Sequence, residues 1–345
     1  MIKVLIVDDS PLVRQLLTHL LSDTSDISVV GAAEDPYEAR ELIKKFNPDV
    51  LTLDIEMPKM DGIAFLRNLM KLRPMPVVMI STLTEKGAAV TLEALSIGAV
   101  DFISKPKSDL TNKLMEYRDE LIEKVRFAAK SKVRPTSPMP ATRLSTSPTR
   151  CSQSQLIAIG ASTGGTEAIQ RLICQLPSDV PPIVIAQHIP AAFSASFAKR
   201  LDSHASMRVI EAQGGELLKP GTAYIAPGNA HLIIERRGGL CYTRLLDTDP
   251  VNRHKPSVDV LFDSVAETAG KSALGVILTG MGKDGAKGLL NMKQSGAYTL
   301  AQDEASSVVW GMPGAAVELD ANCEELHIDR IPAKLLSVMK NASQA

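Results

Sequence analysis

Leu156–Gly165, with the sequence LIAIGASTGG, is an apolar run that ends in a turn of small residues. The pattern predicts a buried strand at Leu156–Ile159 and a helix at Glu167–Ile173, so that Ser162 lies between the two. Glycines beside it permit a positive φ or a close backbone approach, and the helix start leaves N–H groups free to bind an oxyanion. Ser162 is therefore a candidate nucleophile. The Gly-x-Ser-x-Gly pattern alone is weak, because such turns also bind phosphate or cap helices.

Buried strands alternate with helices through the first half of the chain. Ser10-Pro11 supplies an N-cap and a first helical residue for the first of these helices. The predicted strands are Lys3–Val7, Ile27–Ala33, Val50–Leu53, Val77–Ile80 and Val100–Ile103, and the predicted helices are Leu12–Leu21, Tyr37–Phe46, Gly62–Leu72, Lys86–Ile97 and Leu110–Ala129. This alternation indicates an α/β fold with a parallel sheet covered on both faces and a ligand site at the carboxyl ends of the strands.

The second half repeats the strand and helix pattern with one interruption. Further buried strands are predicted at Ile183–Ala186, Ala273–Leu278 and Tyr298–Ala301. Between them, Pro227-Gly228-Asn229 and Gly238-Gly239 separate three apolar runs, Ala223–Ala226, Leu232–Ile234 and Tyr242–Leu245, which we predict to be antiparallel strands or hairpins. The expected fold of this half is a doubly wound, mostly parallel sheet with an antiparallel hairpin region.

Length and composition restrict the class of protein. The chain has 345 residues, enough for about two domains. A formal net charge of −1 and 4% aromatic residues offer nucleic acid little attraction and few stacking platforms, so no nucleic-acid partner is expected. No apolar stretch approaches the ~20 residues that cross a bilayer, and we expect a cytoplasmic protein without direct membrane insertion. The scattered cysteines, Cys151, Cys174, Cys241 and Cys323, are expected to be reduced and structural.

Residues 131–150 differ in composition from both halves. They contain four prolines among Ser, Thr and Arg and few residues that could enter a core, which predicts a semi-extended linker. The expected division is a first domain over residues 1–125, a helix end and linker over 126–153, and a second domain over 154–345.

Polar residues follow the predicted strands of the first half at matching positions: Asp8, Asp9, Asp54, Ser81 and Lys105. Three carboxylates brought together repel one another unless a cation binds, and hard oxygen ligands suit Mg²⁺. Lys105 could neutralise a phosphoryl group on Asp54. A single aspartate at a strand end is usually an ordinary loop residue, but five matching positions make that interpretation improbable.

This set resembles the receiver domain of response regulators, which has a flavodoxin-like fold. The resemblance covers about residues 1–125, and its motifs are Val7–Ser10, Leu53–Gly62, Ser81 and Lys105-Pro106. It implies that Asp54 accepts a phosphoryl group from a histidine kinase.

The same resemblance implies roles for the residues around Asp54. Asp8, Asp9 and Asp54 would hold Mg²⁺. Ser81 matches the hydroxyl that contacts the phosphoryl group, and Phe102 matches the aromatic switch residue.

In the second half, Ser162, His188 and Asp284 each follow a predicted central strand, so a parallel sheet would bring them to one edge. A serine needs a neutral imidazole to take its proton, and the imidazole needs a carboxylate to orient it. The other candidates are the bases His204, His231 and His254 and the orienting carboxylates Asp259 and Asp303. The order Ser, His, Asp differs from that of α/β-hydrolases, so the elbow pattern does not predict their fold.

Residues from about 154 to 340 resemble the catalytic domain of the chemotaxis protein-glutamate methylesterases. The motifs that carry the resemblance are Ile159–Gly165, Gln187–Ile189, Tyr224–Gly228, Arg253–Asp259 and Leu278–Gly285. With the receiver in front, the whole chain is similar to this family.

The resemblance implies a triad of Ser162, His188 and Asp284. Such enzymes hydrolyse glutamate methyl esters on the cytoplasmic helices of chemoreceptors, release methanol, and in many members deamidate receptor glutamines. Expected oxyanion donors are backbone N–H groups among Thr163, Gly164 and Gly165, joined by the Met281 loop. No metal is expected to take part in ester hydrolysis, so Mg²⁺ belongs to the receiver.

Two other functions are compatible with these patterns. One is a serine protease or amidase that is controlled by phosphorylation and has the same triad. The other is a non-catalytic response-regulator adaptor in which the glycine-rich turn only binds a ligand. A transcriptional output would require a basic recognition helix, and the second half has no clear helix-turn-helix signal.

Overall fold

The computed structural model describes residues 1–57, 60–82, 84–105, 114–131 and 155–342. The chain forms two compact units, Met1–Pro138 and Met139–Ala345. Apart from Ser131, the predicted linker lies outside the described residues, and so does Cys151. The same holds for three residues of the quoted motifs, Pro58, Lys59 and Pro106. Within the described parts of the chain, no helix is long and apolar enough to span a membrane.

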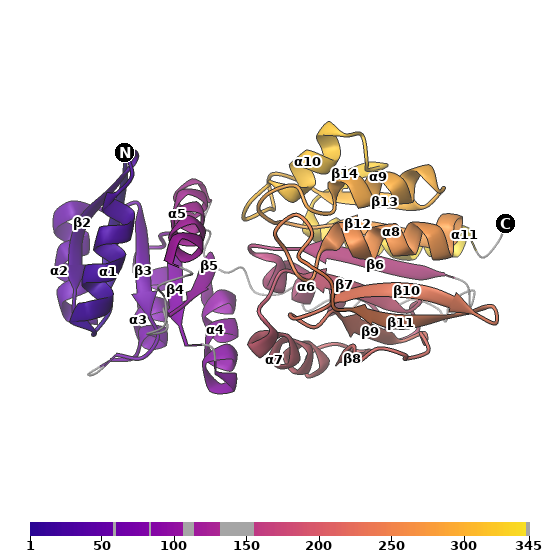
Figure 1. Cartoon of the computed structure of the whole chain (residues 1–345), viewed down its shortest axis with the longest axis horizontal. Coiled ribbons are helices and arrows are strands. Elements are labelled where there is room, and N and C mark those ends of the chain that lie inside the picture. The colour runs from indigo at the N-terminus through magenta and orange to yellow at the C-terminus, as the bar shows by residue number, and fades with distance from the viewer. Residues whose placement is uncertain (58–59, 83, 106–113, 132–154, 343–345) are drawn as a thin grey trace. The chain divides into compact units, whose positions relative to one another are not determined.

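The first unit contains a five-stranded parallel sheet in the order β2-β1-β3-β4-β5 (Figure 1). The strands are β1 (Ile2–Val7), β2 (Ile27–Ala33), β3 (Val50–Asp54), β4 (Val77–Ser81) and β5 (Asp101–Ser104). The helices are α1 (Pro11–Ser22), α2 (Pro36–Phe46), α3 (Gly62–Leu72), α4 (Glu85–Ile97) and α5 (Leu114–Lys130). The strand order is that of flavodoxin-like folds, as predicted.

Local sequence signals explain where these helices begin. Ser10 caps α1 and accepts a hydrogen bond from the Val13 N–H, with Pro11 at the first helical position. Asp35 caps α2 in the same way, and Asp61 caps α3 through a 2.6 Å hydrogen bond from the Ala64 N–H. Because the caps lie just beyond the strand ends, they help to define the loops at the carboxyl edge of the sheet.

The second unit contains a seven-stranded parallel sheet in the order β14-β13-β12-β6-β7-β9-β8. Its strands are β6 (Leu156–Ala161), β7 (Ile183–Gln187), β8 (Arg208–Glu211), β9 (Thr222–Ile225), β12 (Ala273–Ile277), β13 (Tyr298–Gln302) and β14 (Glu324–Leu326). Its α-helices are α6 (Gly165–Ile173), α7 (Ala191–Asp202), α8 (Val258–Ala269), α9 (Ala286–Gln294), α10 (Met312–Glu318) and α11 (Ile331–Ala342). Sequence patterns did not reveal β8 and β14, which have only four and three residues.

The prediction of an antiparallel strand at Ala223–Ala226 is wrong. This segment forms β9, which pairs in parallel with β7 and β8. The Pro227-Gly228-Asn229 loop does not form a hairpin between β9 and the next strand, and the Gly228 backbone packs closely against the segment Ile189–Ala191. The other two runs do form the predicted antiparallel hairpin, β10 (His231–Arg237) and β11 (Leu240–Leu246).

The strand order identifies the edge at which ligands bind. From the central strand β6, the chain moves first to β7 on one side and later to β12 on the other. A crevice forms at the carboxyl ends of parallel strands where the direction of winding reverses. Ser162 follows β6 directly and therefore lies at this switch point.

Helix α8 packs tightly on β6. It contributes Val258 and Phe262 to the same apolar core as Leu156 and Ala158 of β6, and Figure 1 shows α8 running beside α9. Gly160 permits this approach, because a Cβ at this position would lie 2.1 Å from Val258 Cγ1 and 3.1 Å from Phe262 Cζ.

We predict that Gly160→Ala destabilises the second unit by about 1–3 kcal/mol, the usual cost of overpacking a rigid core. Denaturant unfolding of the full chain measures the change. Gly31→Ala in β2 is the control, because its nearest neighbour would be the flexible end of Leu5 at 3.2 Å. Equal losses of unfolding free energy in both variants would contradict this account of the β6–α8 contact.

Candidate active site and acidic pocket

Three carboxylates meet at the carboxyl edge of the first sheet. Asp8 and Asp9 follow β1, Asp54 ends β3, and one ligand oxygen from each lies within 4.8 Å of the others. Asp8 and Asp54 are fully buried, whereas Asp9 is exposed. The predicted acidic cluster is thus brought together by the fold.

Lys105 partly compensates this negative charge. Its Nζ lies 2.6 Å from Asp54 Oδ2 and 3.6 Å from Asp8 Oδ2. Burial raises the pKa of Asp54 to about 6, because the favourable contact with Lys105 does not offset desolvation and the neighbouring Asp8 charge. Burial likewise raises the pKa of Asp8.

The residues of this pocket fit Mg²⁺. Asp8 Oδ2 is buried and has no hydrogen-bond partner among the described residues. Lys105 Nζ, at 3.6 Å, is too far away for a hydrogen bond, so this oxygen keeps the capacity to bind a metal ion, and the three carboxylates supply the hard ligands that Mg²⁺ prefers. The pocket is therefore typical of a Mg²⁺ site.

The two predicted switch residues lie on the neighbouring strands. Ser81 ends β4 and is buried, with its hydroxyl 2.6 Å from the Thr91 hydroxyl on α4. Phe102 on β5 is buried too, and Lys124 Nζ lies 5.1 Å from the centre of its ring. Both side chains belong to the strands that flank the acidic pocket on one side.

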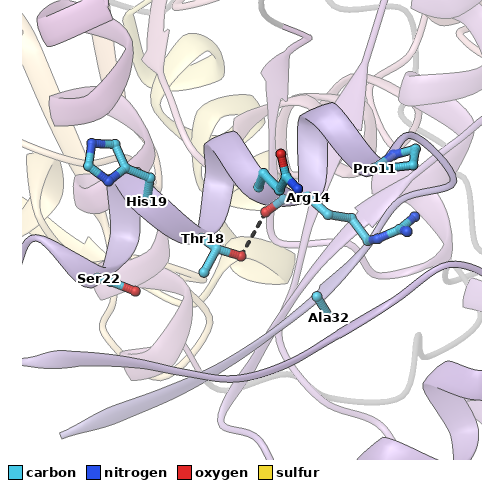
Figure 2. Close-up of a pocket in the computed structure, with 7 residues that line it drawn as sticks. Pro11, Arg14, Thr18, His19, Ser22 and Ala32 are labelled. Carbon is cyan, nitrogen blue, oxygen red and sulfur yellow. Dashed lines mark hydrogen bonds between the residues drawn. The ribbon is translucent and has the colours of Figure 1, made fainter.

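An open hollow lies beside α1 (Figure 2). Arg14 lines it, and its Nη1 donates to the carbonyl oxygens of Asp8 at 2.8 Å and Asp9 at 2.9 Å. Figure 2 also shows the Thr18 hydroxyl bonded to the Arg14 carbonyl, at 2.7 Å. Arg14 thus supports the loop that carries Asp8 and Asp9 by binding its backbone. Neither carboxylate of that loop is among the residues that line the hollow.

In the second unit, the turn at Ser162 is held by backbone and side-chain hydrogen bonds. The Ser162 N–H donates to the Thr279 carbonyl at 3.1 Å, and the Ser162 carbonyl accepts from the Gly165 N–H at 2.7 Å. Gln187 Nε2 donates to the same carbonyl at 2.9 Å. These hydrogen bonds hold the backbone of the turn, and Ser162 as a residue remains partly exposed.

The loop that follows β12 lies directly against this turn. A Cβ at Gly280 would lie 2.8 Å from Ser162 Cβ and 2.3 Å from Met312 Sδ, so only glycine fits. Gly164 has φ 74°, which is one of the two reasons for glycine that the small-residue pattern left open. The sequence therefore uses glycines to bring the exits of β6 and β12 together.

His188 and Asp284 meet at this edge. His188 follows β7, Asp284 lies in the loop after β12, and His188 Nε2 is 2.8 Å from Asp284 Oδ2. The side chain of Asp284 is 1% exposed and that of His188 is 8% exposed. His188 Nδ1 is buried and has no hydrogen-bond partner among the described residues, so this nitrogen is available to accept a proton.

Asp284 is surrounded by donors. Its Oδ2 also accepts from the Val258 N–H at 2.6 Å, and its Oδ1 accepts from Ser257 Oγ at 2.8 Å and Asn252 Nδ2 at 2.7 Å. Burial by itself raises the pKa of Asp284, but the hydrogen bond and charge of His188 and the other donors outweigh it and hold the pKa well below the ordinary value.

The structure also contains a second set of Ser-His-Asp contacts, formed by Ser257, His231 and Asp284. Ser257 and His231 are fully buried. The Ser257 backbone N–H donates to His231 Nδ1 at 3.0 Å, while the Ser257 hydroxyl donates to Asp284. The Ser257 hydroxyl caps α8 and bonds to Asp284 instead of the histidine, so its role is to support Asp284. Without a bond to the histidine, this hydroxyl is poorly placed to attack a substrate. A serine before an apolar helical run is a sequence signal that could have indicated the cap, but nothing local in the sequence indicates the contact with Asp284.

The other candidate histidines and carboxylates make different contacts. His254 stacks on His188 with ring centres 3.6 Å apart, and exposed His204 bonds Arg200 and Ser203 on its own helix end. Asp259 accepts from the Gly288 N–H at 2.7 Å, and Asp303 accepts from the Ser306 N–H at 2.9 Å. The carboxylate that bonds to His188 is that of Asp284, whereas His254 contacts His188 by stacking.

Comparisons with known proteins show which families the two units resemble. The sequence matches the CheB methylesterase family over residues 157–335 and the response regulator receiver domain over residues 4–115. Protein-glutamate methylesterase/protein-glutamine glutaminase 1 of Xanthomonas euvesicatoria pv. vesicatoria is 55% identical over 99% of this chain and 98% of its own length. The corresponding Thiobacillus denitrificans protein is 53% identical over 97% of this chain and 96% of its own length.

A solved structure gives the same relationship for the second unit. The CheB methylesterase catalytic domain of Thermotoga maritima is 40% identical, with a TM-score of 0.53. The match covers 53% of this chain and 98% of that domain.

We predict that Asp284 and Asp259 titrate in opposite directions from the ordinary aspartate pKa of about 3.9. Burial and the Asp284 charge raise the pKa of Asp259, whereas the donors around Asp284 lower its own. On acidification, ¹³C NMR of the carboxyl groups should show Asp259 protonating first, with Asp259→Asn assigning the signal.

The sign for stability follows from the lowered pKa. Ionised Asp284 stabilises the fold above the pKa of an unfolded aspartate, and this contribution is lost as the pH falls through its folded pKa. Protonation of Asp284 before Asp259 would contradict the proposed balance of donors.

Proposed function

The chain belongs to the CheB-type protein-glutamate methylesterase/protein-glutamine glutaminase family, and from this premise we propose that Ser162, His188 and Asp284 form its catalytic triad. The family relationship shows an enzyme with a receiver domain that regulates a methylesterase domain. The observation that most supports the triad is the 2.8 Å contact between His188 and Asp284 at the same sheet edge as Ser162. Ester hydrolysis at this site releases methanol, and amide hydrolysis of glutamine releases ammonia.

The proposed mechanism uses both ring nitrogens of His188. Nδ1 takes the proton of the Ser162 hydroxyl as its oxygen attacks the ester carbonyl, and the imidazolium then protonates the departing methanol. Asp284 keeps the Nε2–H form of the ring in place and stabilises its positive charge. Water enters next and hydrolyses the acyl-enzyme along the same proton path in reverse.

Backbone N–H groups beside Ser162 are the proposed oxyanion donors. The candidates are Thr163, Gly164 and Met281, whose amides lie in the turn after β6 or the loop after β12. Gly165 is a weaker candidate than the sequence indicated, because its N–H already donates to the Ser162 carbonyl. This step requires no metal in the proposed mechanism.

We propose further that phosphorylation of Asp54 activates the enzyme. Asp8, Asp9 and Asp54 would hold Mg²⁺, which balances the added phosphoryl charge when bound. Lys105 would exchange its contact with the Asp54 carboxylate for one with the phosphoryl group. Ser81 would contact the same group, and Phe102 would change its position in response.

The proposed partners follow from the family. A chemotaxis histidine kinase supplies the phosphoryl group, and the cytoplasmic helices of chemoreceptors present the methylated glutamates, which places the reaction in the cytoplasm. The proposed domains are a receiver at 1–125, a helix end and linker at 126–153, and a catalytic domain at 154–345. The family matches at residues 4–115 and 157–335 support this division. The protease and adaptor alternatives have no comparable support.

We predict that Ser162→Ala abolishes methanol release from methylated receptor membranes with little change in stability, because it removes the nucleophile from a turn of small residues. Ser203→Ala, at an exposed serine of the same unit, should leave the rate unchanged. Near-normal turnover by folded Ser162→Ala would exclude Ser162 as the nucleophile.

We also predict that phosphoryl incorporation requires both Asp54 and Mg²⁺. Wild type should lose labelling when a chelator removes the metal, and Asp54→Asn should not be labelled or activated in either condition. Asp119→Asn, at an exposed position on α5, is the matched control and should behave like wild type. Equal labelling of wild type and Asp54→Asn would rule out Asp54 as the acceptor.

A further inference from the structure

A tight turn at Val251–His254 lies against the His188–Asp284 pair. The Val251 N–H donates to the His254 carbonyl at 3.1 Å, and the His254 N–H donates to the Val251 carbonyl at 2.9 Å. Both central residues have positive φ, 53° at Asn252 and 69° at Arg253. Positive φ is uncommon for residues other than glycine, although asparagine tolerates it better than most. The protein thus maintains an unfavourable backbone conformation beside its catalytic groups.

The Asn252 side chain joins two buried carboxylates. Its Nδ2 donates to Asp284 Oδ1 at 2.7 Å and to Asp259 Oδ2 at 2.8 Å, so both amide protons are used. A neutral donor between two acids reduces their repulsion and fixes the separation of the groups. The Asn252 amide binds Oδ1 of Asp284, and His188 binds the other oxygen, Oδ2.

The other end of the turn contacts the histidine itself. The His254 ring stacks on His188 with centres 3.6 Å apart and planes inclined by 13°. The stacked ring limits the tilt of His188 on that face. One turn therefore contacts both members of the pair, the carboxylate through Asn252 and the imidazole through His254.

We propose that Asn252 is a positioning residue for catalysis, which acts through Asp284 to hold His188 in the orientation and tautomer that Ser162 needs. This inference rests on the proposed triad. Asn252 does not touch the reacting atoms, so its effect is on the geometry of the general base. Misplacement of such a group lowers the rate of the chemical step more than it lowers substrate binding.

The position of Asn252 separates this role from a general structural one. Asn252 is exposed as a residue, and only its amide reaches the buried carboxylates. Ser257 also donates to Asp284 Oδ1, but it is fully buried and caps α8, so its replacement would disturb the helix as well. Asn252 is the better site for a clean substitution.

The test uses the full-length phosphorylated protein and methanol release from methylated receptor membranes. Asn252→Gly removes the amide and tolerates the positive φ, and Asn252→Asp keeps the shape but removes the donor. Both variants should lose about 10-fold to 100-fold in kcat with little change in KM. Arg253→Gly, which relaxes the same turn without removing the amide, should retain wild-type kcat.

A measurement independent of activity is the tautomer of His188. In the wild type, ¹⁵N NMR should show a protonated Nε2 and an unprotonated Nδ1, because Nε2 donates to Asp284. The signal is assigned by its loss in His188→Gln. Asn252→Gly should weaken this preference and yield a mixture of tautomers, whereas Arg253→Gly should not.

These outcomes separate the inference from the triad on which it rests. Wild-type kcat and an unchanged His188 tautomer in Asn252→Gly would overturn the positioning role, even if Ser162→Ala is inactive. An active Ser162→Ala would overturn the proposed nucleophile, and the tautomer would still show whether Asn252 orients the pair. A fall in kcat for Arg253→Gly equal to that for Asn252→Gly would assign the effect to the turn backbone and also overturn the proposal.

Discussion

The buried carboxylate of Asp284 is the group on which the organisation of the second unit's functional edge depends. An isolated ionised carboxylate is costly to bury, and proteins reduce this cost by surrounding it with donors. Here the donors come from two regions that are distant in sequence: His188 after β7, and the segment that runs from Asn252 in a strained turn to the start of α8 at Ser257 and Val258. Satisfying one charge therefore fixes the positions of several segments relative to one another.

Two buried acids, Asp284 in the second unit and Asp54 in the first, have pKa values shifted in opposite directions. Asp284 receives enough hydrogen bonds to lower its pKa, which keeps it charged and able to hold an imidazolium. Asp54 is crowded by Asp8 and meets Lys105 as its main compensating charge, so burial raises its pKa to about 6. A carboxylate whose oxygens all accept hydrogen bonds is suited to a permanent supporting role. A cluster of carboxylates whose negative charge is only partly balanced is suited to binding a cation and a further charged group.

In both sheets the candidate functional residues lie at the carboxyl ends of the parallel strands. Parallel strands deliver their exit loops to a common edge, and the reversal of winding opens a crevice there. Close approach of those loops requires small residues, which explains why Gly280 lies against Ser162 and why α8 can pack on Gly160. In the second unit the partly exposed Ser162 lies at this switch point, and the largely buried His188–Asp284 pair lies at the same sheet edge.

Sequence by itself determined the alternation of strands and helices, the parallel sheets and the cap at Ser10-Pro11, because short-range periodicity and turn chemistry encode them. It also placed Asp8, Asp9, Asp54, Ser162, His188 and Asp284 just after predicted strands, which made them candidates for sites at the sheet edges. Only the tertiary structure decided that β9 is parallel, since strand pairing depends on contacts between segments that are distant in sequence, here those of β9 with β7 and β8. It likewise decided which histidine pairs with which carboxylate: His188, His231 and His254 are chemically equal in sequence, and their burial and neighbours alone distinguish them. Asn252 and Ser257 could not be recognised as supports for Asp284, because a hydrogen bond across 32 or 27 residues leaves no local pattern.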